Sequence, residues 1–175
     1  LALQEQHGEH AHLGLPWITP SVLRAGEPVQ MNVMPGEAAV WVDVRTVPSV
    51  DHTALIGELD HVVAEAAGSA GISTTLTVID DRPSVATPEQ HALVQAVLDA
   101  HTVVTGTPGR LGGVPGATDG TVLTSRTGMA SVVYGPGGKW IAHQADEYVD
   151  VDDLITHAHA YTEAAARFLG AERAA

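Results

Sequence analysis

Two charged residues on one predicted strand have a spacing that suits binding chemistry. Asp43 and Arg45 are two positions apart in the strand predicted over 38–46, so they share one face of it. A guanidinium held by a neighbouring carboxylate binds a substrate carboxylate well, and Asn32 could add a donor. The alternative interpretation is a surface ion pair, which stabilises a fold little.

A histidine near the C-terminal end is a candidate metal ligand. His143 lies in the segment 142–147, Ala-His-Gln-Ala-Asp-Glu, after a glycine turn at 135–138 and ahead of a predicted helix. Neutral imidazole is a good zinc ligand, and a nearby carboxylate can fix its tautomer. The alternative is a structural histidine, because a zinc site takes about three or four protein ligands.

The glycine-rich segment 113–120 is a third candidate. A glycine-rich loop can present backbone N–H groups to an anion, and Asp119 could orient a neighbouring group. Taken alone, the segment is better interpreted as a flexible crossover loop.

Hydrophobic periodicity and turn residues predict the elements that must position these groups. The predicted helices cover 1–6, 51–67, 88–105 and 150–170, and the predicted strands cover 17–25, 38–46, 72–79 and 130–134. Pro20 indicates an edge or bulged position in the first strand, and Thr87 to Gln90 read as a capping box. The order strand, strand, helix, strand suits a small α+β sandwich, and the break after residue 80 predicts a domain boundary.

Composition excludes several classes of protein. The chain has 175 residues and a formal net charge of −13, which disfavours nucleic acid and anionic membrane surfaces. No apolar run is long enough for a membrane span, and no signal peptide is visible. The absence of cysteine removes disulfides and thiolate-bound zinc, and it fits a cytoplasmic protein.

Common catalytic motifs are absent. We find no P-loop around Lys139, no dinucleotide-binding G-x-G-x-x-G, no G-x-S-x-G elbow and no H-E-x-x-H. His7, His10 and His12 cluster near the start, but their irregular spacing favours an exposed loop over a metal site. A metal-buffering protein, suggested by ten histidines, is a weak alternative because most of them fall on helices.

Taken together, the candidate segments resemble one family. It is the co-catalytic zinc amidohydrolase family of acetylornithine deacetylase, succinyl-diaminopimelate desuccinylase, glutamate carboxypeptidase and aminoacylase. Order and spacing match over nearly the whole chain, although each piece is weak alone. The matching segments are Asn32–Pro35, Asp43–Pro48, Gly116–Asp119, Gly135–Gly137 and Ala142–Glu147.

The resemblance implies a fold and roles for named residues. Residues 1–80 would be a truncated ferredoxin-like two-layer sandwich, the dimerisation or lid domain. Residues 81–175 would be the second half of an α/β zinc-hydrolase catalytic domain. By the match, His143 would be a zinc ligand, Asn32 and Arg45 would bind a substrate carboxylate, and the pocket would be lined by Gly116, Ala117 and Thr118.

The implied activity is metal-dependent hydrolysis of an amide bond in a small, carboxylate-bearing substrate. Two zinc ions, or cobalt or manganese, would activate a water and polarise the scissile carbonyl, and a glutamate would move the proton. The other metal ligands and this general base lie in the family's front half, which this chain lacks.

The chain also begins at Leu1 without an initiator methionine. We therefore expect a piece of a longer polypeptide, inactive alone and homodimeric through its lid. The alternative is a non-catalytic dimerisation or ligand-binding module that reuses the fold.

Overall fold

The computed structural model describes residues 3–27, 31–138 and 141–170. By its internal contacts the chain divides into two units, Leu1–Asp81 and Arg82–Ala175, and each is described by itself. The division falls beside the boundary predicted after residue 80. That the first unit is a lid and the second a catalytic half-domain stays a prediction.

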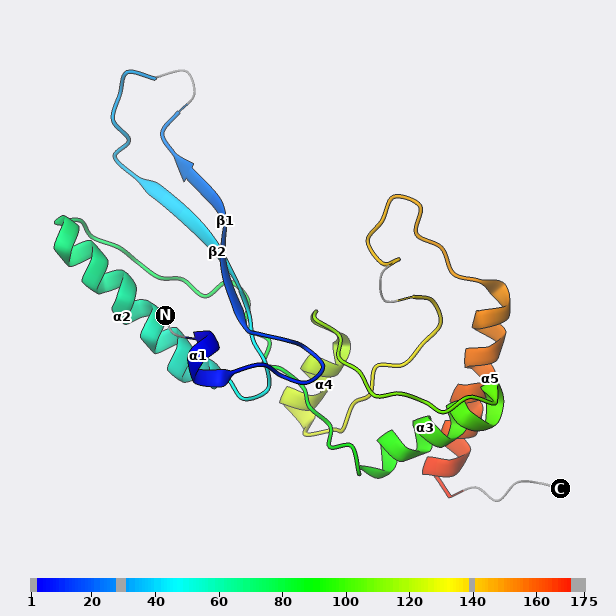
Figure 1. Ribbon diagram of the computed structural model, residues 1–175. Coiled ribbons are helices and arrows are strands. Elements are labelled where there is room, and N and C mark those ends of the chain that lie inside the picture. Colours follow the sequence, from blue (N-terminus) through cyan, green and yellow to red (C-terminus); the bar gives the residue numbers. More distant parts are fainter. Residues whose placement is uncertain (1–2, 28–30, 139–140, 171–175) are drawn as a thin grey trace. The chain divides into compact units, whose positions relative to one another are not determined.

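The first unit is built on a two-stranded antiparallel hairpin. β1 (Trp17–Ala25) pairs with β2 (Ala38–Arg45), both as predicted to within one residue (Figure 1). The register shifts between Pro20 and Val22. Proline has no N–H to give to the ladder, so the irregularity predicted at Pro20 is confirmed.

Helix α2 (His52–Ala70) packs against the base of this hairpin. The Asp51 carboxylate accepts the Ala54 N–H and caps the start of the helix, while Gly71, at φ 68°, ends it. The core contains Val47, Val50 and Leu55, with Leu13, Ile18, Val44 and Leu59 packed against it. The helix predicted over 51–67 is confirmed, three residues longer at its end. The short helix α1 (Leu3–His7) ends before Gly8, as predicted.

The strand predicted over 72–79 is wrong. The segment follows α2 as an extended chain, and of its side chains only Leu76 is even partly buried. Threonine alternation favours an extended backbone, but a strand also needs a neighbour to complete its hydrogen bonds. The sheet of the described residues therefore has two strands, β1 and β2.

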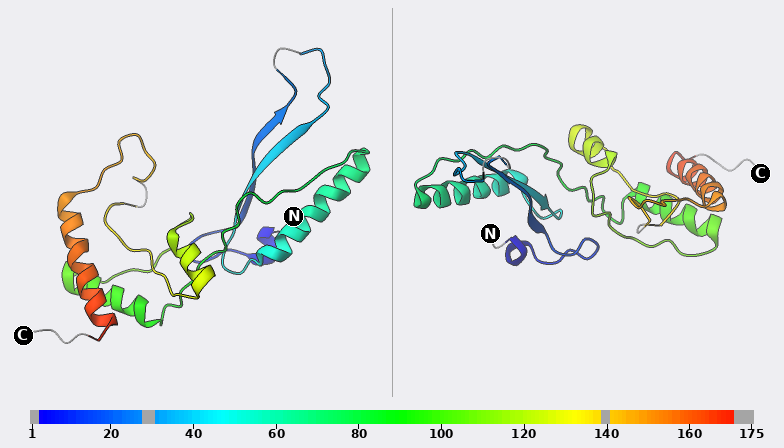
Figure 2. Two further views of the ribbon diagram at one scale, coloured as in Figure 1. Left: turned by 180° about the vertical axis from the view of Figure 1, so that it is seen from behind. Right: turned by 90° about the horizontal axis from the view of Figure 1, so that it is seen from above.

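The second unit is organised around two crossing helices, α3 (Ala92–Thr105) and α5 (Val151–Phe168), as Figures 1 and 2 show. Small side chains let the two helices approach closely, and Ala100 and Ala160 are both 0% exposed. Asp150 caps α5 through the Asp152 N–H, as predicted. A third helix, α4 (Asp119–Thr127), was not predicted, because its residues show little apolar periodicity.

The capping box predicted at Thr87 is also wrong. Helix α3 begins at Ala92, and the side chain that caps it is His91, which accepts the Leu93 N–H. The Thr87 hydroxyl is used elsewhere: it donates to the Ser131 carbonyl at 2.6 Å and accepts the Ser131 N–H at 3.1 Å. A long-range partner therefore overrides the local capping pattern. The strand predicted over 130–134 is likewise absent: the Ser131 backbone bonds to the Thr87 side chain, and the Tyr134 carbonyl accepts from the Tyr161 hydroxyl.

The described residues thus form a mixed α and β protein, with a two-stranded sheet and five helices. Within them, no helix combines the length and apolar character that a membrane span requires.

Candidate functional site

His143 has an unusual backbone and an exposed side chain. Its φ is 67°, and among the described residues it is the one non-glycine residue with positive φ. This conformation costs an L-residue about 1–2 kcal/mol. The His143 N–H donates to the Glu147 carboxylate at 2.8 Å, which helps to hold the turn. Within the described part of the chain, no hydrogen bond or ion pair engages the His143 imidazole, and the residue is exposed.

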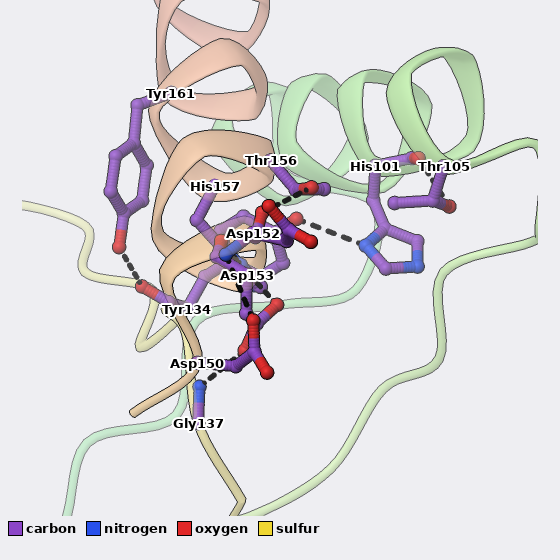
Figure 3. Close-up of polar contacts among 10 residues, drawn as sticks. All are labelled: His101, Thr105, Tyr134, Gly137, Asp150, Asp152, Asp153, Thr156, His157 and Tyr161. Atoms are coloured by element: carbon purple, nitrogen blue, oxygen red, sulfur yellow. Dashed lines mark hydrogen bonds and ion pairs between the residues drawn. The ribbon is translucent and has the colours of Figure 1, made fainter. Parts of the chain in front are cut away.

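Residues on one face of α5 bind the segment from Tyr134 to Gly137, which precedes His143 in the chain (Figure 3). Asp153, His157 and Tyr161 are spaced four apart and share this face. The Asp153 carboxylate accepts the Gly137 N–H at 2.6 Å, and the Tyr161 hydroxyl donates to the Tyr134 carbonyl at 2.8 Å. The segment from Tyr134 to Gly137 is therefore fixed to the helix at both of its ends.

The same segment is held from α3. The Tyr134 hydroxyl shares a 2.9 Å hydrogen bond with His101 Nδ1, and the Tyr134 ring lies 4.9 Å from the His157 ring between centroids. Partial burial raises the pKa of Tyr134 above its ordinary value of 10.0, and the charges of Tyr161 and Asp153 act in the same direction. Tyr134 thus links the two main helices of the unit.

The glycine-rich candidates lie in the approach to α4. Gly116 and Ala117 are exposed, and Thr118 is the residue before the first turn of α4. Thr118 makes no side-chain capping hydrogen bond there. Asp119 is the first residue of the helix, where its charge suits the positive end of the helix dipole. Binding of a substrate by Gly116, Ala117 and Thr118 stays a prediction.

The predicted carboxylate clamp lies at the end of β2. Arg45 Nε donates to Asp43 Oδ2 at 2.7 Å, so the two residues share a face as their spacing predicts. Both side chains are about half exposed, 57% for Arg45 and 50% for Asp43. Asn32 is exposed in the connection between β1 and β2. This geometry fits both interpretations, a clamp and a surface ion pair.

The candidate residues are divided between the two units of the chain. Asn32 and Arg45 belong to the first unit, whereas Gly116, Ala117, Thr118 and His143 belong to the second. Among the described residues, no group of three or more His, Cys, Asp or Glu is placed to hold a metal ion. By itself, His143 fits a metal as one ligand through its neutral imidazole.

Sequence reasoning missed the network around Tyr134. His101 and His157 fall within predicted helices, and the sequence gives them no partner. One signal in the sequence could have indicated part of this network. Asp153, His157 and Tyr161 recur at intervals of four, which places polar groups along one helix face. Nothing in that pattern shows which segment the face contacts.

Comparison with known proteins identifies the family. The profile of Peptidase family M20/M25/M40 matches residues 4–167, almost the whole chain. Probable succinyl-diaminopimelate desuccinylases of Staphylococcus aureus strains MSSA476 and MW2 are each 23% identical over 152 residues, which is 85% of this chain and 36% of theirs. The chain belongs to peptidase family M20/M25/M40, and the resemblance expected from its motifs is confirmed. It spans about a third of the length of the curated relatives it matches.

Proposed function

We propose that this chain is part of a metal-dependent amidohydrolase of the desuccinylase and deacetylase type. The observation that carries the proposal is the family match over residues 4–167, which includes the segment of His143. The exposed imidazole of His143, on a backbone held at φ 67°, supports its role as a metal ligand. Strained backbone of this kind is concentrated at functional sites.

Zinc is the metal that we propose, as two ions in the whole protein, with cobalt or manganese as alternatives. When bound, such a metal polarises the substrate carbonyl and lowers the pKa of a water. His143 would contribute one neutral nitrogen ligand. Glu147 would help to orient this ligand without binding the metal, because its carboxylate accepts the His143 backbone N–H.

The substrate would be a small amide that carries a carboxylate. Asp43 holds the Arg45 guanidinium in place and leaves it more than half exposed, which supports its use as a carboxylate clamp. Asn32 would add an amide donor. Gly116, Ala117 and Thr118 would line the substrate pocket, where small side chains allow a close approach to the backbone.

Residues 1–80 would be the lid, a ferredoxin-like sandwich through which two copies pair as a homodimer. The exposed apolar side chains of the hairpin support such a pairing, among them Leu23, Val40 and Val42. Residues 81–175 would contribute one portion of the catalytic domain. By the resemblance, the general base and the remaining ligands would come from the family's front half, so we expect the 175-residue chain to be inactive by itself.

The decisive experiment is a substrate panel on the full-length protein with zinc. Because the relatives are named as desuccinylases, the panel should compare N-succinyl amino acids with N-acetyl amino acids and dipeptides. We expect hydrolysis by the full-length protein and none by the 175-residue chain. Failure of the full-length protein to hydrolyse any member while still binding one would favour the non-catalytic module. Hydrolysis by the 175-residue chain alone would contradict the division of the site proposed here.

A further inference from the structure

The loop that carries His143 leaves from and returns to the first turn of α5. We call residues 138–149 the His143 loop, of which the structure describes 138 and 141–149. It starts after Gly137, whose N–H is bound by Asp153, and it ends at Asp150, the N-cap of α5. Two residues three positions apart on one helix therefore set both ends of the loop.

Hydrogen bonds within the His143 loop are short in range. The Ile141 N–H donates to the Gly138 carbonyl at 3.1 Å, and the His143 N–H donates to Glu147. These bonds shape the described part of the loop locally. Anchoring at the two ends restricts where the loop can lie, because a loop with anchored ends has far fewer conformations than a loop held at one end.

Asp153 suits the role of an anchor through both of its carboxylate oxygens. Oδ2 accepts the Gly137 N–H at 2.6 Å, and Oδ1 lies 3.0 Å from His157 Nδ1. His157 Nδ1 also contacts the Asp153 carbonyl oxygen at 2.8 Å, so the imidazole holds the Asp153 side chain against the helix. An ionised oxygen makes a stronger bond to a backbone N–H than a neutral acceptor does.

The turn that Asp153 holds accepts few residues other than glycine. Gly137 has φ 85°, a conformation that L side chains rarely adopt. A Cβ added to Gly135 would lie 3.1 Å from the Tyr161 hydroxyl, so the turn lies close against α5. Figure 3 shows Gly137 below the first turn of α5, with Asp153 pointing toward it.

We propose that Asp153 is a positioning residue: it anchors the start of the His143 loop to α5 and so holds His143 where a metal can use it. The proposal rests on the proposed role of His143 as a metal ligand. Asp153 itself contacts neither metal nor substrate in this scheme. It acts through the Gly137 backbone, with His157 as its support.

The test compares Asp153→Ala with Asp152→Ala in the full-length protein. Asp152 is the neighbouring carboxylate in the same helical turn, so its loss changes the net charge and the helix dipole equally. Hydrogen exchange of the Gly137 amide and of the His143 loop is measured without metal, and zinc affinity is measured by competition with a chelator. For Asp153→Ala we expect exchange about 10-fold faster and zinc affinity lower by about 10- to 100-fold. Asp152→Ala should leave both unchanged.

Two further variants separate anchoring from general instability. Asp153→Asn keeps an oxygen for the Gly137 N–H, so it should restore most of the protection and affinity lost in Asp153→Ala. Ala100→Gly weakens buried α3 without touching the anchor, so it should spare zinc affinity. The proposal is overturned if Asp153→Ala matches Asp152→Ala in either readout, or if Ala100→Gly reproduces both effects. A different result would separate the two proposals. If exchange is faster in Asp153→Ala but zinc binding does not depend on His143, the proposed function is refuted, whereas the anchoring of the loop by Asp153 is supported.

Discussion

The His143 loop and the first turns of α5 hold histidines in opposite settings. The His157 side chain is 12% exposed, and its Nδ1 lies against both the carboxylate and the carbonyl of Asp153. The His143 imidazole is exposed and, in the described part of the chain, makes no hydrogen bond, while its backbone adopts positive φ. A largely buried imidazole whose Nδ1 is engaged fits a structural role, whereas an exposed imidazole on a constrained backbone fits a ligand.

The largest effect that this comparison predicts is on metal binding. His143→Ala in the full-length protein should lower zinc affinity by about 100-fold or more, since it removes a ligand rather than an outer partner. Thermal unfolding of the metal-free protein should be unchanged. Zinc affinity is measured by chelator competition, and His159→Ala, an exposed histidine on α5, is the matched control. Zinc content equal to that of the parent would remove His143 from the site.

The contrast between exposed and engaged side chains extends to the hairpin. Arg45→Lys keeps the charge but loses the planar fork, so the KM for carboxylate-bearing substrates should rise by about 10- to 100-fold. Steady-state kinetics of the full-length protein would measure this change. The control in the same hairpin is Arg24→Lys. The Arg24 guanidinium lies 5.9 Å from the Trp41 ring centroid. Equal KM values for both variants would leave the Asp43–Arg45 pair as a surface ion pair.

We expect substitutions in helix α5 to affect the stability of the fold, in contrast to the metal-binding role proposed for the His143 loop. Ala160 is 0% exposed, so Ala160→Leu should overpack the contact between α3 and α5 and lower the free energy of unfolding by about 1–3 kcal/mol. Urea unfolding measures the loss. Ala158→Leu adds the same atoms to an exposed position of the helix and should change stability little. A large effect at Ala158 would show that further chain covers this side of α5.

The smallest predicted effect is a loss of stability in alkali. Because the pKa of Tyr134 is raised above 10.0, the unfolded chain releases this proton at lower pH than the folded chain does. Stability from this group is complete below pH 10.0 and declines as the pH rises toward the folded pKa. Tyr134→Phe should remove that part of the decline in unfolding experiments on either side of pH 10.0. An unchanged decline would assign it to other groups.

Local pattern was sufficient for the two strands and for the two longest helices. β1, β2, α2 and α5 were all predicted, because alternation or helical periodicity is visible within each. The segment 72–79 shows the limit of this reasoning, since its alternation is strand-like but no strand among the described residues pairs with it. Thr87 fails for the opposite reason: its capping pattern is sound, but Ser131 takes its hydroxyl.

By itself, the sequence determined the family and the identity of the candidate ligand. The motifs around Arg45 and His143 are read from residue type and spacing, which need no coordinates. Only the tertiary structure decided that Asp153 holds Gly137 and that the His143 backbone adopts positive φ. A periodicity shows which residues share a face of a helix, but the partner of that face is chosen by long-range contacts, which the spacing of residues does not contain.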